Sequence, residues 1–428
     1  METEISMRFT YDHSGITDEV RKETHTRLST LIDHLSKLPS TYQSPESTLT
    51  LPLDGAMREA IRALLEKIGI GSVKYIAVFG IGGSSAGAKA VYDALRTQQT
   101  PRMLFFETTD VRATRSFLSE ITSQAKSADE LLLVIVSKMG ETLETIADAE
   151  CVISELHPHF PEIESRIVVI SNSGSPLLLA AEKRHLHTYA LAPAVRGRYS
   201  IFSPAGLIPL AAAGFDVEAL CGGAREMNER CLSTTSKDNP AAESAGFLSY
   251  WYKQGLKIHD LFYFGPELRS LGFWSRQILA ESIGKDGIGI TPTVSIGSTD
   301  LHSTAQLHLG GGGGMTVLFV DRERVDESLR VPRERLFPDL VPYLSGKSLS
   351  ELMQVLRDAA VSAYAAKKVP LIGVSLGAVT ERELGMYLQW KMIETIFLAE
   401  LLGVDPFTEP DVASYKEHAR EVLQDAHE

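Results

Sequence analysis

Cysteine is scarce in this sequence, with three residues among 428. They are Cys151, Cys221 and Cys231, and none stands in a CxxC pair or at metal-ligand spacing. The 12 histidines are scattered and form no HExxH pattern. So sparse a set predicts free thiols in a reducing compartment rather than a disulfide framework. We therefore expect no metal centre.

Long apolar runs are also missing. No segment approaches the roughly 18 residues that a membrane helix needs, and residues 1–15 lack the apolar core of a secretory signal. The formal net charge is −13, which argues against a general nucleic-acid binder. We expect a cytoplasmic protein without membrane or nucleic-acid partners. A small anionic ligand stays open, because a pocket can be positive on an acidic surface.

The composition, 44% hydrophobic and 23% charged, is that of an ordinary globular enzyme. Short apolar runs alternate with helical segments, and several runs lack polar alternation, which is typical of parallel strands covered on both faces. They lie at residues 75–80, 103–108, 130–138 and 166–172, and again at 260–265, 291–297, 315–320 and 370–375. The pattern predicts an α/β protein with two tandem, doubly wound, mainly parallel sheets flanked by helices.

The chain thus divides into three predicted parts. Residues 1–49 form a helical N-terminal arm, residues 50–235 a first α/β domain, and residues 236–428 a second α/β domain that ends in C-terminal helices. The five consecutive glycines at 310–314 predict a flexible loop between two elements.

The turn GIGGSS, residues 80–85, joins a buried strand to a helix. Ligands of open α/β sheets bind at such strand ends, and the helix N-terminus there favours a phosphate. Ser84 adds a hydroxyl donor. A dinucleotide fingerprint fails because Ser85 stands in place of the third glycine, and a Walker loop would need GK[ST]. A tight turn without a ligand remains an alternative.

A second turn of this kind follows the next buried run of the first domain. In SKMGETLET, Ser137 and Thr142 supply hydroxyls next to Lys138, which by itself could be an ordinary solvated lysine. Two such turns can converge on one anion. Here the sequence resembles the sugar-isomerase (SIS) domain, which binds phosphorylated sugars. That resemblance alone does not separate an isomerase from a sugar-sensing regulator.

Candidates for chemistry lie later in the chain. Gln277 and Glu281 are four residues apart and share one helix face. His302 lies in a polar loop, where it could move a proton near neutral pH. Arg198 stands among apolar residues, which is costly without a negative partner. Lys416 lies on a C-terminal helix. Taken singly, each could be incidental surface polarity.

Together these segments resemble the glucose-6-phosphate isomerase family. The motifs GIGGSS, SKxGxTxET, GRYS, ESxGK, TDxHS and a DPF…K tail occur in family order between residues 75 and 420. The resemblance implies an aldose–ketose isomerase that interconverts D-glucose 6-phosphate and D-fructose 6-phosphate through a cis-enediol intermediate, in glycolysis and gluconeogenesis. It implies no cofactor and no metal.

The resemblance also implies roles for single residues. Glu281 would be the base that moves a proton between C2 and C1, and Arg198 would stabilise the intermediate. His302 and Lys416 would open the sugar ring, and Gln277 would position the substrate. The remaining substrate-binding residues, at the phosphate end, would be Ser84, Ser137, Lys138 and Thr142. The family is usually a homodimer in which the loop histidine comes from the neighbouring subunit, so His302 would act across the interface.

Four positions depart from the family pattern. Met139 replaces a usual Thr or Ser of the phosphate turn, and Glu141 lies nearby, so we expect its carboxylate to point away. Leu301 and Glu409 each stand where a glutamine is usual. These changes bear on sugar affinity and specificity. Two alternatives therefore stay open: a non-catalytic sugar-phosphate-binding protein, and an isomerase of a related hexose phosphate such as mannose 6-phosphate.

Overall fold

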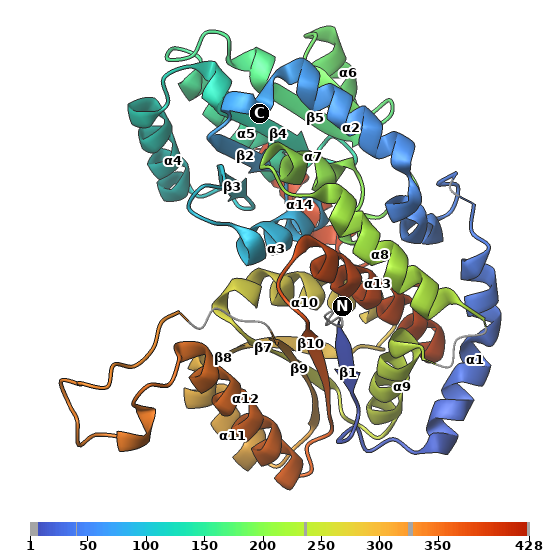
Figure 1. Cartoon of the computed structure of the whole chain (residues 1–428). Coiled ribbons are helices and arrows are strands. Elements are labelled where there is room, and N and C mark those ends of the chain that lie inside the picture. Colours follow the sequence, from blue (N-terminus) through green and yellow to red (C-terminus); the bar gives the residue numbers. More distant parts are fainter. Residues whose placement is uncertain (1–6, 40, 235–237, 324–327, 426–428) are drawn as a thin grey trace.

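The computed structural model describes residues 7–39, 41–234, 238–323 and 328–425. It contains two five-stranded sheets in separate halves of the molecule, with long helices packed around and between them (Figure 1). The predicted α/β fold with two mainly parallel sheets is thereby confirmed. The predicted domain boundary after residue 235 lies outside the described residues.

The first sheet is parallel throughout, with the strand order β3-β2-β4-β5-β6. Its strands are β2 (Tyr75–Phe79), β3 (Arg102–Phe106), β4 (Leu131–Val136), β5 (Ile167–Asn172) and β6 (His187–Leu191). All six residues of β4 are buried, because helices cover both faces. The covering helices are α2 (Gly55–Ile68), α3 (Ala86–Leu95) and α7 (Pro204–Ala212) on one face, and α4 (Val111–Gln124), α5 (Leu143–Leu156) and α6 (Pro176–Lys183) on the other.

The second sheet has the order β1-β10-β9-β7-β8 and is parallel except for β1. Its strands are β1 (Arg8–Thr10), β7 (Ile258–Phe264), β8 (Thr291–Gly297), β9 (Met315–Arg322) and β10 (Leu371–Leu376). The strand β1 differs from the helical arm predicted for this end of the chain. Phe9 packs edge-on against Trp390, with ring centroids 5.2 Å apart, and this contact anchors the strand at the sheet edge.

Helices fill the space between and outside the sheets. Figure 1 shows α13 (Glu381–Leu402) and α8 (Val217–Leu232) running together between the two halves. Apart from its first and last turns, α13 is buried all round, which is typical of a core helix. The other helices are α1 (Asp18–Ser36), α9 (Pro240–Lys253), α10 (Arg269–Ile283), α11 (Thr304–Gly310), α12 (Leu349–Ala366) and α14 (Ala413–Asp425).

Two segments stand apart from this packing. The glycines predicted as a flexible loop end α11 and lead into β9, which confirms a loop between two elements. An arm that the structure describes at residues 328–348 projects from the second half (Figure 1). It carries exposed apolar side chains, among them Leu336, which is 85% exposed, and Phe337. In the described residues, no helix is both long and apolar enough to cross a membrane.

Candidate active site

The GIGGSS turn lies at the carboxyl end of β2 and is shaped by close backbone contacts. Gly82 has a φ of 59°, which favours glycine. A Cβ on Gly83 would lie 2.0 Å from the carbonyl carbon of Gly197, so glycine lets the two loops touch. Ser200 Oγ donates to the Gly83 carbonyl oxygen at 3.0 Å. The turn is thus fixed against the loop that carries Arg198.

The two serines of this turn have different surroundings. Ser85 is buried, and its Oγ donates to Glu107 Oε1 at 2.9 Å. Glu107 is also paired with Lys89 on α3, so Ser85 supports the turn. Ser84 is only partly buried and lines a cavity described below, where its hydroxyl can meet a ligand.

The second turn follows β4 and leads into α5. Ser137 Oγ lies 2.9 Å from Thr142 Oγ1 and accepts the Thr142 backbone N–H at 3.3 Å. Both hydroxyls therefore gather at the N-terminus of a 14-residue helix, where the helix dipole favours an anion. Met139 is 67% exposed. Glu141 lies 3.8 Å from Arg420 on α14 and is half exposed, so its carboxylate has a cationic partner outside the turn.

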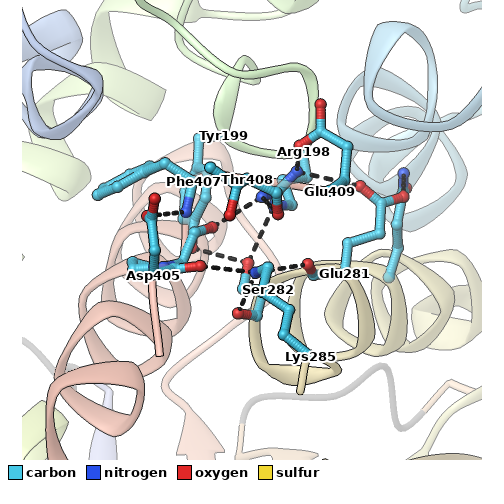
Figure 2. Close-up of polar contacts among 11 residues, drawn as sticks. Arg198, Tyr199, Glu281, Ser282, Lys285, Asp405, Phe407, Thr408 and Glu409 are labelled. Carbon is cyan, nitrogen blue, oxygen red and sulfur yellow. Dashed lines mark hydrogen bonds and ion pairs between the residues drawn. The ribbon is translucent and has the colours of Figure 1, made fainter. Parts of the chain in front are cut away.

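Arg198 is the centre of a polar cluster built from three segments (Figure 2). Its side chain is 2% exposed. The Nη1 nitrogen donates to Glu409 Oε2 at 2.7 Å and lies 3.5 Å from Glu281 Oε2. Nη2 donates to the backbone oxygens of Pro406 and Thr408, at 2.8 and 3.1 Å. Burial without these partners would be costly, which explains an arginine among apolar neighbours.

Glu281 connects this cluster to the GIGGSS turn. It lies on the last turn of α10, and its Oε1 accepts the Nε2 of Gln277 at 2.7 Å. The Nε2 of Gln277 would lie 2.8 Å from a Cβ on Gly82, so it contacts the turn. The predicted helix face is confirmed. Arg198, Glu281, Gln277 and the first turn therefore form one continuous site.

Three residues that support this site had no role in the sequence analysis. Ser282 Oγ accepts the Nε of Arg198 at 3.0 Å and lies 2.9 Å from the hydroxyl of Tyr199. Lys285 Nζ donates to the backbone oxygens of Ser282 and Asp405, at 2.7 and 2.6 Å. It thereby joins the end of α10 to the segment that carries Glu409. Ser282 and Lys285 belong to the ESxGK motif, which is the sequence signal that could have identified them as supporting residues.

The electrostatics of the second turn centre on Lys138. Burial and the neighbouring guanidinium of Arg196 lower the pKa of the Lys138 ammonium to about 8, while the Glu409 carboxylate acts in the opposite direction. The Nε of Arg196 is buried and has no hydrogen-bond partner among the described residues. Lys138, Arg196 and Arg198 thus gather positive charge beside the two turns, which suits an anion.

A cavity of about 480 Å³ adjoins the two turns. It is lined by Ser84, Lys138 and Gly197 at one side and by apolar side chains such as Met57 and Leu191 elsewhere. One residue of each turn lines this cavity, Ser84 and Lys138, whereas Glu281, Arg198 and Gln277 are not among its lining residues. Both Ser84 and Lys138 therefore face open space.

Two of the predicted catalytic residues are exposed and do not take part in the polar cluster. His302 ends a short helical turn (Thr299–His302) after β8 and is exposed. Lys416 is exposed on α14, with its Nζ 5.9 Å from the ring centre of Tyr415. In the described part of the chain, no hydrogen bond or ion pair joins either residue to Glu281 or Arg198.

Comparison with known proteins gives this site a context. The sequence model of the family "Phosphoglucose isomerase" matches residues 55–314, more than half of the chain. The chain belongs to this family. The phosphoglucose isomerase relatives include "Glucose-6-phosphate isomerase" of Rubrobacter xylanophilus, 29% identical over 94% of this chain and 93% of the relative. A "Probable glucose-6-phosphate isomerase" of Haloarcula marismortui is 30% identical over 83% of this chain and 79% of the relative.

Solved structures share the fold of this chain. A crystal structure of a hypothetical protein from Thermus thermophilus has a TM-score of 0.84 and 27% identity, covering 97% of this chain and 99% of that one. A glucose-6-phosphate isomerase from Chlamydia trachomatis also has a TM-score of 0.84, with 20% identity over 100% of this chain and 92% of that one, and shares the fold. The predictions of the phosphoglucose isomerase family, and of an isomerase enzyme within it, are confirmed.

Proposed function

We propose that this isomerase interconverts D-glucose 6-phosphate and D-fructose 6-phosphate, with Glu281 as the base and Arg198 as the stabilising cation. One observation carries the proposal: Glu281 contacts both Arg198 and Gln277, and Gln277 contacts the first glycine-rich turn. A carboxylate, a buried guanidinium and a phosphate-type turn are thus held together. The names of the curated relatives support the choice of sugar.

The mechanism follows from what the two charged groups can do. In the open-chain aldose, Glu281 takes the proton from C2 while O1 gains one, which gives a cis-enediol. The same carboxyl then returns its proton to C1 while the O2 hydroxyl loses one, and the ketose results. Negative charge that develops on O1 and O2 meets Arg198, which is already oriented by Ser282 and two backbone oxygens. Gln277 holds the carboxylate of Glu281 in place.

The phosphate end of the sugar has a separate set of donors. We assign it to the hydroxyls of Ser84, Ser137 and Thr142 and to the N-terminus of α5, with Lys138 above them. The gathered positive charge and the two adjacent turns support this assignment. Glu141 does not oppose it, since its carboxylate pairs with Arg420.

The proposal is tested by a coupled assay of fructose 6-phosphate conversion on the purified protein, with a chelator present. We expect turnover that survives chelation. A parallel assay with mannose 6-phosphate tests the related hexose phosphate, for which we expect a kcat/KM at least about tenfold lower. Binding of fructose 6-phosphate without turnover would instead support the non-catalytic sugar-phosphate protein.

We further propose that the enzyme is a homodimer in which each site receives His302 from the partner. Two observations support this. His302 is exposed, and within the described residues of its own chain it has no hydrogen bond or ion pair to Glu281 or Arg198. The projecting arm at 328–348 exposes Leu336, Phe337 and Tyr343, and apolar groups of this kind mark contact surfaces. Together with Lys416, His302 would then open the sugar ring.

Mixed dimers distinguish partner contribution from action within one chain. Glu281→Gln and His302→Gln variants, each inactive, are produced together with different tags. If His302 acts across the interface, half of the dimers carry one intact site, and about a quarter of the wild-type activity returns. If His302 acts within its own chain, every site keeps one defect and activity stays absent. Wild-type dimers treated alike provide the reference.

The lowered pKa of Lys138 predicts a pH dependence. Its ammonium is charged below pH 8 and neutral above it, so kcat/KM for the sugar phosphate should fall as the pH rises through about 8. Lys138→Arg keeps its charge to at least about pH 10 and should lose this fall. Lys183→Arg, an exposed change on α6, should keep the wild-type profile. An unchanged profile in Lys138→Arg would count against a role of Lys138 in binding the anion.

The cytoplasm is the location that we propose, and glycolysis and gluconeogenesis are the pathways. The three cysteines support a reducing compartment, because none of them forms a disulfide. An aldose–ketose isomerase of hexose phosphates serves both directions of sugar metabolism, since a reaction of this type runs either way.

A further inference from the structure

Arg198 Nη1 differs from the other two nitrogens of its guanidinium. Nε is bound to Ser282, and Nη2 is bound to two backbone oxygens. These partners belong to the framework of the site. Nη1 instead meets two carboxylates, Glu409 at 2.7 Å and Glu281 at 3.5 Å. It is the side of Arg198 from which an arriving oxyanion can replace a partner.

The two carboxylates that contact Nη1 come from different segments of the chain, and both side chains are partly exposed to solvent. Glu281 comes from α10 and Glu409 from the segment after α13, and their side chains are 37% and 41% exposed. Because both Oε2 atoms contact Nη1, the distance between them cannot exceed the sum of their distances to that nitrogen. Figure 2 shows both side chains on the same side of Arg198. A ligand oxygen that binds Nη1 would therefore lie close to Glu409.

The second oxygens of the two carboxylates are placed differently. Glu281 Oε1 is held by Gln277 at 2.7 Å. Glu409 Oε1 has no hydrogen-bond partner within the described residues. Glu409 thus brings a full negative charge and a free acceptor to the place where the sugar head would lie. It lies in the irregular segment between α13 and α14.

We propose that Glu409 is a specificity-determining residue, which occupies Arg198 in the empty site and favours sugar phosphates with an uncharged, hydroxyl-bearing head over those with an anionic head. This inference rests on the proposed function of the site. A carboxylate accepts hydrogen bonds from hydroxyls, whereas a second carboxylate beside it is repelled and must also compete for Nη1.

The effect is large enough to measure. Two negative charges a few ångströms apart repel substantially even when the site is partly open to water. Neutralising Glu409 therefore removes an electrostatic repulsion. This repulsion weakens the binding of a ligand with an anionic head but not of a ligand with a neutral head. We expect a tenfold to hundredfold gain in affinity for the anionic class, against a smaller change for the sugar substrate.

The test uses 5-phospho-D-arabinonate as the anionic probe. Its carboxylate stands where the reacting carbons of fructose 6-phosphate lie, and its remaining carbons match that sugar. In Glu409→Gln, the inhibition constant of this acid should fall at least tenfold, and the ratio of KM for fructose 6-phosphate to that constant should rise at least as much. Asp411→Asn is the matched control, because Asp411 is exposed two residues away, and its ratio should stay within about twofold of wild type.

Several outcomes separate the possibilities. Equal changes in KM and in the inhibition constant, or no change in either, would overturn the inference. A rise in the ratio that Asp411→Asn reproduces would also overturn it, because the effect would then be one of net charge. Glu409→Ala makes the same charge change and should show the same ratio if the glutamine variant is unstable. Should the wild-type protein not isomerise the sugar, the proposed function fails, yet calorimetric binding of the acid to both forms still tests Glu409.

Discussion

Replacement of Glu281 by glutamine is expected to lower kcat on the order of 10³–10⁴-fold while the fold is kept. The amide cannot take a proton from carbon at neutral pH. Its size matches the carboxylate, so the contact with Gln277 can persist. The side chain is 37% exposed at the end of α10, so little burial energy depends on its charge. Steady-state kinetics of fructose 6-phosphate conversion measure the loss, and circular dichroism checks the fold.

The matched control for this prediction is Glu400→Gln. Glu400 is exposed near the end of α13 and has no ion pair with Arg198 or Lys285 among the described residues, so the same change of charge and shape should alter kcat by less than about twofold. Binding of the substrate to Glu281→Gln should stay within about tenfold of wild type, because the phosphate donors are untouched. If Glu281→Gln keeps more than a tenth of the wild-type kcat, Glu281 is not the base.

Much of the fold could be predicted from the sequence, because burial on both faces leaves a clear pattern. The run Leu131–Val136 has no polar alternation, and all of its residues are buried in β4. The edge strands β1 and β6 could not be predicted in this way, although the other two edge strands, β3 and β8, were predicted. Strand β6 is only partly buried, and β1 has three residues with a single one half-buried. Neither strand contains a run of fully buried apolar residues, so the composition of each resembles that of a loop.

The site was predictable only where its contacts are local in sequence. Gln277 and Glu281 are four residues apart on one helix, and helix geometry brings them together. Arg198 and Glu409 are separated by 211 positions, so no spacing rule indicates their contact. On the basis of the family resemblance, Arg198 was predicted to be catalytic, and Glu409 was identified as a departure from the family pattern. Their ion pair could be recognised only from the structure, because the path of the chain after α13 brings Glu409 to Arg198.

Supporting residues were the hardest to identify for the same reason. Lys285 follows α10 in the chain, yet its ammonium holds Asp405, which precedes Glu409. Its sequence surroundings, GKDG, are those of a surface turn. Only the packing of two distant segments shows that this lysine is buried and satisfied by backbone oxygens. Contacts of this kind depend on tertiary structure and not on periodicity.

Replacement of Arg198 by lysine is expected to lower kcat about 10²–10³-fold, although the charge is kept. An ammonium is compact and cannot contact Ser282, the backbone oxygens of the 406–408 segment and the carboxylates at once, as the planar guanidinium does. The charge that we propose to stabilise the cis-enediol would then lose its fixed position. KM should change less than kcat, because the proposed phosphate donors are other residues.

The same replacement should also destabilise the protein, by about 3 kcal/mol, because several charged hydrogen bonds are lost in a buried place. Urea unfolding measures this change, and Arg276→Lys is the control: Arg276 lies on the exposed face of α10 over the ring of Phe273 and should lose less than about 0.5 kcal/mol. A loss of stability without a loss of kcat would mean that Arg198 only joins the three segments. A loss of kcat that exceeds what partial unfolding explains instead requires that the guanidinium itself meets the reacting oxygens.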